Sequence, residues 1–499
     1  MKLRISPIAE PDIEVGGRVI GKEPKLILPE GGPLGSIFFN GVKPIPLGLV
    51  VLPSNKARLV EWMDAMHTLL LDDESNAQRF RAFPGDEKAL RARFELRFVR
   101  ELDEDRFNLA LQRPSDKKFE ELLEIYIESI RSLFIDQGPA CILVDFPEEV
   151  ATLRISNPKL TFAEQRALER LQAEEDDRQL DLFEPTTEEK KAASELAPQA
   201  EDLLFRVFHR ALKAKCMLER NCVPLQVIRR QTYIDEEAKQ SRATRAWNLG
   251  VALYYKSGNI PWQPYDLAAD TCFVGVSFHH LKRRSGDLVY ASVAQAFSNQ
   301  LEPFALRGDT VPKEQTRNKQ PYLTTDQATV LAHRVIGEYK TRTGGSLPTR
   351  LVVHKTSRYE PEEVKGFRDE VLSSVPACDL VSLAPTGFRL LRRGVEAPER
   401  GTLCTVEDSN HYLFTTGYVS AWKEYPGPHI PAPMEIGAAN QTTIIERARE
   451  VLSLTKVNWN NADGIGRYPI TITFARRVGI TMTELEEDDK PNSLYRYYM

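Results

Sequence analysis

Four polar side chains near the middle of the chain are spaced so that they can meet around one anion. His209 and Lys213 stand one helical turn apart in the segment F-H-R-A-L-K-A-K-C. Gln226 follows a proline that opens an apolar strand, and Lys256 ends a second helical segment. Ammonium and amide groups donate well to phosphate oxygens. The spacing therefore predicts a pocket for a terminal phosphate lined by these four residues.

Each of these motifs has an ordinary explanation when it is taken alone. A His and a Lys at helical spacing most often form a solvated helix face, and Pro-x-Gln before a strand is found in many α/β proteins. The information lies in their order along the chain and in the segment W-N-L-G-V-A-L-Y-Y-K-S-G-N-I-P-W that follows them.

The order His-x-x-x-Lys, Pro-x-Gln-Val and Asn-Leu-x-x-x-Leu-x-x-Lys-x-Gly-x-x-Pro-Trp resembles the MID domain of prokaryotic Argonaute proteins. This resemblance implies that the 5′ phosphate of a guide strand is held by His209, Lys213, Gln226 and Lys256, with Asn248 as a further candidate. It also implies a Mg²⁺ ion at that phosphate, held with the carboxylate of Met499.

The second half of the chain resembles a PIWI domain, a relative of RNase H. RNase H-type cleavage needs two divalent ions, which are held by several carboxylates on adjoining strands. The resemblance places those ligand positions at Ser277, Thr356 and Arg476, and none of the three is a carboxylate. A hydroxyl is a poor Mg²⁺ ligand and a guanidinium repels the ion. We therefore expect no metal-dependent cleavage by this chain.

Nearby acids offer little compensation. Asp270 precedes Ser277 by seven residues, which is roughly 23 Å along a strand and on the opposite face. Glu360 lies four residues after Thr356 but is a single carboxylate, and the adjacent pair Glu407 and Asp408 is typical of a solvated turn. A catalytically active guide-directed endonuclease remains the alternative interpretation.

The pattern of apolar residues predicts the elements that position these side chains. Strand alternates with helix in the first half, and paired strands are followed by crossover helices in the second. We expect strands at 45–52 and 140–146 and at the segments T-C-F-V-G-V-S-F, D-L-V-Y-A-S-V-A-Q-A-F and R-L-V-V-H, and a β-rich stretch at 380–419. Helices are expected at 56–71, 119–134, 325–342, 361–372, 442–454 and 471–480.

The predicted fold class is α/β, with a Rossmann-like MID domain followed by an RNase H-like PIWI domain. We place the MID domain at 1–265, including an N-terminal leader and an acidic helical insertion at about 161–200, and the PIWI domain at 266–499. Net charge is -5, but the chain has thirteen acids and five bases between Glu164 and Asp202, and eleven bases and four acids between Arg206 and Lys256. The acidic segment thus masks a locally basic region that suits a nucleic-acid partner.

Composition favours a cytoplasmic protein of two or three domains. The chain has 499 residues, 42% of them hydrophobic, and no apolar run that reaches the roughly 20 residues a membrane helix needs. Its six cysteines form no Cys-x-x-Cys pair, which suits a reducing compartment. We expect no membrane partner.

The MID and PIWI resemblance, with no room for N and PAZ domains ahead, identifies the chain as similar to short prokaryotic Argonautes. This implies a short guide RNA, a complementary single-stranded target DNA and a partner chain that joins an APAZ domain to an effector. The effector is a TIR or sirtuin-like NADase or a nuclease, activated on recognition of plasmid or phage sequence. A structural subunit that never loads guides is a further alternative.

Overall fold

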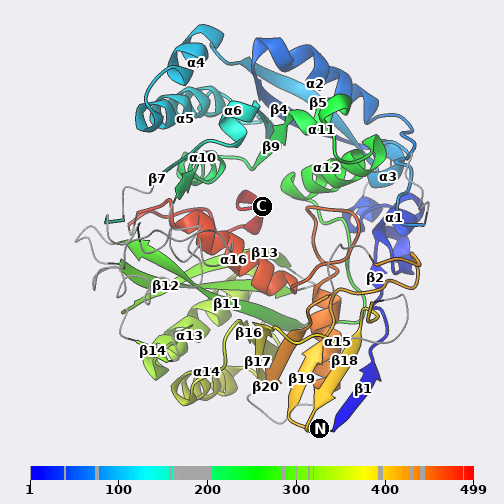
Figure 1. Cartoon of the computed structure of the whole chain (residues 1–499), viewed down its shortest axis with the longest axis vertical. Coiled ribbons are helices and arrows are strands. Elements are labelled where there is room, and N and C mark those ends of the chain that lie inside the picture. The colour runs from blue at the N-terminus through cyan, green and yellow to red at the C-terminus, as the bar shows by residue number, and fades with distance from the viewer. Residues whose placement is uncertain are drawn as a thin grey trace, which may run out of the picture.

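Two β-sheets, one in each half of the chain, form the framework of the protein (Figure 1). The computed structural model describes residues 2–38, 41–72, 78–156, 160–161, 166, 205–268, 270–282, 288–298, 301–312, 315–317, 320–390, 397–425, 431–438, 444–486 and 488–499. No helix among these residues is both long enough and apolar enough to cross a bilayer.

The first sheet is parallel and has the strand order β5-β4-β6-β9. Its strands are β4 (Lys43–Val51), β5 (Ala92–Glu101), β6 (Cys141–Phe146) and β9 (Leu225–Arg229). Helices alternate with them, and β6 is buried along its whole length because helices cover both faces. The helices are α2 (Pro53–Ala65), α3 (Asp86–Leu90), α4 (Glu104–Leu111), α5 (Ser115–Arg131), α6 (Glu148–Ala151), α10 (Phe208–Cys216), α11 (Arg230–Tyr233) and α12 (Arg242–Lys256).

The second sheet has nine strands in the order β1-β18-β19-β20-β17-β16-β11-β12-β13. Strands β11, β16 and β17 run parallel to one another, and the other neighbours are antiparallel. The strands are β1 (Leu3–Pro7), β11 (Thr271–Lys282), β12 (Leu288–Ser298), β13 (Leu301–Val311), β16 (Arg350–Lys355), β17 (Ala377–Pro385), β18 (Thr402–Val406), β19 (Asn410–Leu413) and β20 (Met434–Ala438).

Alternate residues of the central strands face two different layers of helices. Val274 and Val276 of β11 pack in one core cluster with α13 (Thr325–Arg342) and α14 (Pro361–Ser374). Phe273, which directly precedes Val274 and points the other way, belongs to the large cluster with α15 (Ile444–Leu454) and α16 (Ile470–Met482). Helix α16 crosses β11 closely at Gly275, where a Cβ atom would lie 2.2 Å from the main-chain oxygen of Thr471.

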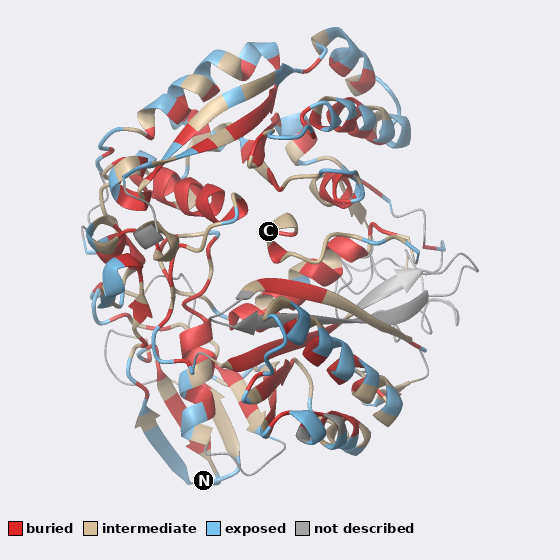
Figure 2. Cartoon of the chain, turned by 180° about the vertical axis from the view of Figure 1, so that it is seen from behind, coloured by how far each residue is buried: buried red, intermediate tan, exposed pale blue. Residues whose placement is uncertain are grey.

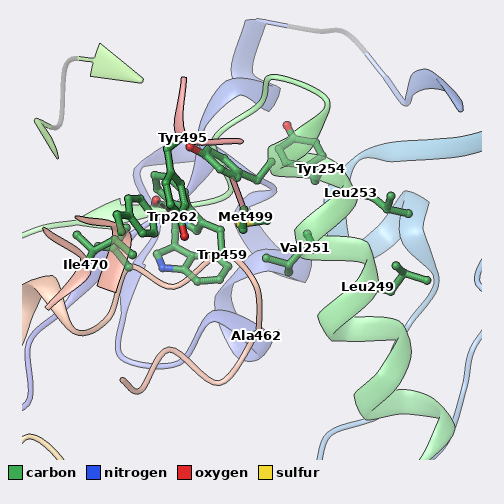
Figure 3. Close-up of a cluster of buried hydrophobic side chains, with 14 of the residues drawn as sticks. Leu249, Val251, Leu253, Tyr254, Trp262, Trp459, Ala462, Ile470, Tyr495 and Met499 are labelled. Atoms are coloured by element: carbon green, nitrogen blue, oxygen red, sulfur yellow. Dashed lines mark hydrogen bonds between the residues drawn. The ribbon is translucent and has the colours of Figure 1, made fainter. Parts of the chain in front are cut away.

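The two halves share one continuous core, and the C-terminal segment lies between them. The large cluster joins residues of β4 and α12 to residues of α16 and of the last turn, η4 (Tyr495–Tyr497). Figure 3 shows Tyr495 and Met499 packed beside Trp262 and Trp459. The ring of Tyr495 also stacks on Phe474. The C-terminus is therefore anchored where the two sheets face each other (Figure 1).

Short elements complete the fold. A three-stranded sheet joins the N-terminal segment to the link between the two halves, and a helix follows it. The sheet consists of β2 (Ile13–Glu14), β3 (Ile20–Gly21) and β10 (Gln263–Pro264), and the helix is α1 (Pro24–Gly31). Two further antiparallel pairs are β7 (Arg154–Ser156) with β8 (Phe205–Val207) and β14 (Thr316–Arg317) with β15 (Gln320–Pro321). The single turns are η1 (Gly16–Arg18), η2 (Leu34–Phe38) and η3 (Asp235–Glu237).

Most predicted elements are confirmed, and the differences have local causes. Helix α13 has the predicted bounds, but the helix predicted at 56–71 begins at Pro53 and ends at Ala65. Proline suits the first helical turn, and Leu70 is already paired with Phe83 in a β-bridge. The N-terminal leader contributes an exposed edge strand, β1, to the second sheet (Figure 2). Of the predicted acidic insertion, all but residues 161 and 166 lie outside the described residues, and the domain division at 265 stays a prediction.

Candidate functional site

The four side chains predicted to bind an anion line one pocket. Its volume is about 460 Å³, and residues of both halves of the chain line it. The four side chains come from α10, β9 and α12, while α16 and the last residue of the chain contribute further lining residues. Helices α10, α12 and α16 lie around the C-terminus in Figure 1. The pocket is lined chiefly by His209, Lys213, Gln226, Lys256, Arg477 and Met499.

Packing behind the pocket fixes the two helices that carry most of its cations. Phe208, the first residue of α10, is buried and meets the rings of Phe119, Tyr126 and Phe146 edge-on at 5.5 Å each. This anchor orients the next turn, with His209 and Lys213, toward the pocket. Helix α12 is capped at its start by Ser241, whose hydroxyl accepts from the Thr244 amide, and its buried length ends at Lys256.

Two ammonium groups hold the polar oxygens at the wall of the pocket. Lys256 Nζ donates to the side-chain oxygen Oε1 of Gln226 and to the main-chain oxygen of Leu225, both at 2.8 Å. Lys213 Nζ donates to the main-chain oxygen of Met499 at 2.5 Å. Both lysines are buried, so their positive charges lie against neutral amide groups and the end of the chain.

The pairing of these lysines differs from that of the other buried lysines in the described residues. Lys25, Lys355 and Lys456 each contact a carboxylate, at 2.6, 2.6 and 2.7 Å. Lys256 contacts none, and the only carboxylate at Lys213 is the chain's own end, on Met499; no Asp or Glu is among the residues that line their pocket. A buried charge is costly unless it is paired. The positive charge of the pocket therefore exceeds what the C-terminal carboxylate can balance, and an anionic ligand would supply the missing negative charge.

The pKa values of the basic groups in the pocket reflect the same excess of buried positive charge. Burial, followed by the charge of Lys256 nearby, holds the pKa of Lys213 well below its usual range. Burial also lowers the pKa of Lys256 to about 8. The pKa of half-buried His209 is likewise depressed, by burial and then by the charges of the two lysines. A bound phosphate would reverse these shifts because an anion favours the protonated forms.

Asn248 occupies a different position from the other predicted residues. It lines an adjoining pocket of about 190 Å³, which shares Gln226, Thr232 and Asn460 with the first. Its side-chain oxygen Oδ1 accepts from the main-chain amide of Ala462 at 3.0 Å, so it holds the loop before α16. The structure thus brings together four of the five predicted phosphate ligands and places the fifth beside them.

Arg477 is a pocket residue that the sequence analysis did not identify. It is half-buried on α16, and its Nη1 lies 3.4 Å from the hydroxyl of Tyr495. The neighbouring Arg476 was singled out instead, but it is exposed, and its guanidinium lies 5.6 Å from the centre of the Tyr468 ring. The two arginines differ only in which side of α16 they occupy. Which side faces the pocket is set by how the helix packs on the sheet.

Two of the positions matched to nuclease ligands belong to the second sheet, and the third, Arg476, lies on α16. Strands β11 and β16 pair in register with Val276 opposite Lys355, so Thr356, directly after β16, comes level with Ser277 within β11. Ser277 is buried, and its hydroxyl has no hydrogen-bond partner among the described residues. Among the contacts of the described residues, none joins Arg476 to either of them.

Nearby acids on this sheet are already engaged. Glu360 caps α14 and pairs with Arg317 at 2.7 Å. Glu407 and Asp408 form the predicted turn between β18 and β19, both with positive φ, and Asp408 contacts Lys2 at 2.5 Å. Among the described residues, no group of three or more His, Cys, Asp or Glu side chains is arranged to hold a metal ion.

Comparisons with known proteins place the fold. No protein-family model matches the chain, and no curated protein matches its sequence. Clostridium butyricum Argonaute, solved with a guide DNA and a 19-mer target DNA, matches with a TM-score of 0.61 and 12% identity over 99% of this chain and 55% of its own. Aa-Ago, solved with externally bound siRNA, matches with a TM-score of 0.57 and 13% identity over 99% of this chain and 56% of its own.

These matches confirm the predicted fold class, an α/β architecture of the Argonaute type. The chain spans about half the length of the two Argonautes, and its similarity to them runs through nearly all of its own residues.

Proposed function

We propose that this chain recognises nucleic acid through a short guide strand whose 5′ phosphate is held in the pocket between the two halves. The observation that carries this proposal is the pair of buried ammonium groups, Lys213 and Lys256, in a pocket whose lining includes no Asp or Glu. Phosphate monoesters carry about -1.5 to -2 charges at neutral pH and accept several hydrogen bonds. Such a group supplies the charge that the pocket lacks.

The two structural neighbours support a nucleic-acid ligand over other phosphate compounds. One of them holds a guide DNA with a target DNA, and the other was solved with siRNA. Anchoring one terminal phosphate fixes the register of a strand without reading its sequence. Base pairing then supplies specificity, as in other guided systems. We propose a short RNA as the guide and complementary single-stranded DNA as the target, following the resemblance to short prokaryotic Argonautes.

The test compares nucleic acid retained by purified protein variants. Lys213→Ala combined with Lys256→Ala is expected to remove 5′-phosphorylated guides, measured by extracting and end-labelling the bound nucleic acid. A matched control removes two charges from the exposed residues Lys215 and Lys239, which lie outside the pocket, and should retain guides. Unchanged guide content in the Lys213/Lys256 variant would contradict the phosphate pocket. Protein that carries no nucleic acid even as the wild type would favour a structural subunit.

We further propose that the chain itself does not cleave the target. Ser277 and Thr356 offer hydroxyl groups where RNase H-type chemistry requires carboxylates, and Arg476 carries the opposite charge. The guide-loaded protein from the same purification is therefore expected to leave a labelled matching strand intact with Mg²⁺ or Mn²⁺. Cleavage that EDTA stops and that a substitution in this chain removes would establish the endonuclease instead.

If the chain recognises a target without cleaving it, a separate effector must turn that recognition into an activity. We propose a partner chain with an APAZ domain and a TIR, sirtuin-like or nuclease effector, activated when the target pairs with the guide, in defence against plasmids or phage. Activation requires that target binding favour the active state of the partner by a differential free energy, typically a few kcal/mol. Mass spectrometry of the co-purified protein tests this: a stoichiometric chain without an effector domain would contradict it.

A further inference from the structure

A divalent cation at the guide phosphate needs oxygen ligands, and in this pocket those ligands are bonded to ammonium groups. Mg²⁺ takes six oxygens at about 2.0–2.1 Å, usually including at least one carboxylate. The resemblance supplies the carboxylate of Met499 for that role, and Gln226 offers a side-chain oxygen beside the predicted phosphate position. One oxygen of the Met499 carboxylate already accepts from Lys213, and Oε1 of Gln226 accepts from Lys256.

The two ammonium groups would also repel the ion. Each lies within hydrogen-bond distance, 2.5 and 2.8 Å, of an oxygen to which the ion would have to bind. Both lysines are buried, so solvent screens the repulsion only weakly. The remaining lining residues that bear side-chain oxygens contribute hydroxyl and amide groups and no acid. The donor set of the pocket therefore does not fit a Mg²⁺ ion.

We propose that the pocket binds the 5′ phosphate without a divalent cation and that Arg477 binds this phosphate together with Lys213 and Lys256. This inference rests on the proposed function, because it specifies how the guide phosphate is held. Lys213 and Lys256 take the place of the metal charge, and Arg477 adds a guanidinium from the other half of the molecule.

Arg477 is placed to serve in this way. Its one described hydrogen bond goes to the hydroxyl of Tyr495, whose ring is buried and stacked on Phe474. That contact supports the side chain and leaves other N–H groups of the planar guanidinium for a ligand. A guanidinium binds phosphate oxygens in pairs, which a lysine cannot do. Three cations less the charge of the C-terminal carboxylate also balance a phosphate of about -2 charges without an added ion, and Arg210 and Arg229 line the same pocket.

The first experiment needs only the wild-type protein. Guide-free protein is titrated with fluorescently labelled oligonucleotides of one sequence, with and without a 5′ phosphate, in excess EDTA, in Mg²⁺ and in Mn²⁺. The measured quantity is the ratio of the two dissociation constants, which cancels the general effect of cations on backbone binding. We expect the same preference for the phosphorylated strand in all three buffers.

Each other outcome has a clear meaning. A preference that disappears in EDTA and returns with Mg²⁺ or Mn²⁺ would overturn the inference while leaving the proposed function intact. No preference in any buffer would overturn the proposed function itself.

The second experiment tests Arg477. Arg477→Gln is expected to lower the preference for the phosphorylated strand by about tenfold, the loss of one charge-assisted pair, and to leave binding of the unphosphorylated strand unchanged. Arg477→Lys should recover part of it because the charge returns without the planar fork. Arg449→Gln, an equal charge change at an exposed site on α15, is the matched control. An undiminished preference in a folded Arg477→Gln protein would show that Arg477 does not bind the phosphate.

Discussion

The two halves of the molecule bury positive charge in opposite ways. In the second half, Lys355 lies between both oxygens of Glu363, at 2.6 and 2.7 Å, and Arg350 contacts Asp379 and Glu450, each at 2.6 Å. At the pocket, Lys256 bonds only to neutral oxygens, and Lys213 bonds only to an oxygen of the C-terminal residue. Matched charges hold elements of the fold together, whereas unmatched buried charges are poised for a ligand of the opposite sign.

The difference also predicts where stability is lost. A buried ion pair is satisfied within the chain, so removing one partner leaves the other uncompensated. An unpaired buried cation instead disfavours the folded state until an anion binds. A ligand that binds only the folded protein offsets this cost because binding shifts the folding equilibrium toward the folded state. Protein without guide is therefore expected to be less stable than the loaded form.

The largest effect is expected where a matched pair is broken. Lys355→Met leaves Glu363 fully buried with only the main-chain amides of Leu323 and Glu360 as donors. The expected loss is about 3–5 kcal/mol in the free energy of unfolding, measured by urea denaturation with unchanged slope. Adding Glu363→Gln should restore much of it. A loss no larger than that of an exposed lysine would mean that the pair is not structural.

Removal of an unmatched charge should act in the opposite direction. Lys256→Met keeps most of the length of the side chain and removes a buried ammonium that contacts only neutral oxygens. We expect the guide-free protein to gain about 1 kcal/mol or more in the free energy of unfolding, while the preference for a 5′-phosphorylated strand falls. Lys215→Met, at an exposed position on α10, should change neither quantity. A destabilised Lys256→Met protein would show that its bonds to Leu225 and Gln226 outweigh the cost of the charge.

Features of the fold and of the pocket that depend on local sequence patterns could be predicted, whereas contacts between residues far apart in the chain could not. The order of His209, Lys213, Gln226 and Lys256 along the chain predicted that they meet, because each sits at a fixed place on a helix or strand of a regular parallel fold. The segment A-R-F-E-L-R-F-V-R-E also alternates as a strand should, and it forms β5, although it was not predicted.

Other features lack a local signal altogether. Strand β1 pairs residues 3–7 with residues 402–406, and nothing near either segment specifies the other. The contact between Lys213 and Met499 likewise joins residues 286 positions apart. The choice between Arg476 and Arg477 depends on how α16 is rotated on the sheet, which its own sequence leaves open because both faces of that helix carry polar residues.

The smallest expected effect is a pH dependence that separates the unmatched lysines from the matched ones. Lysine in an unfolded chain has a pKa of about 10.4, whereas burial lowers the pKa of Lys256 to about 8. Burial lowers the pKa of Lys355 too, but the charge of Glu363 opposes that shift. Between about pH 8 and pH 10 the unfolded chain therefore binds more protons than the folded chain at Lys256, so stability rises with pH in this interval.

Phosphate binding must change in the opposite sense, because it requires the protonated ammonium. We expect the preference for a 5′-phosphorylated strand to fall from pH 8 to pH 10 while the free energy of unfolding of guide-free protein rises. Lys256→Met should flatten the rise in stability, and Lys215→Met, which removes an exposed lysine, should leave it as in the wild type. Equal slopes in the two variants would mean that Lys256 keeps its proton in the folded protein. In that case the charge of Lys256 would be stabilised in the folded protein, as the charge of Lys355 is stabilised by Glu363.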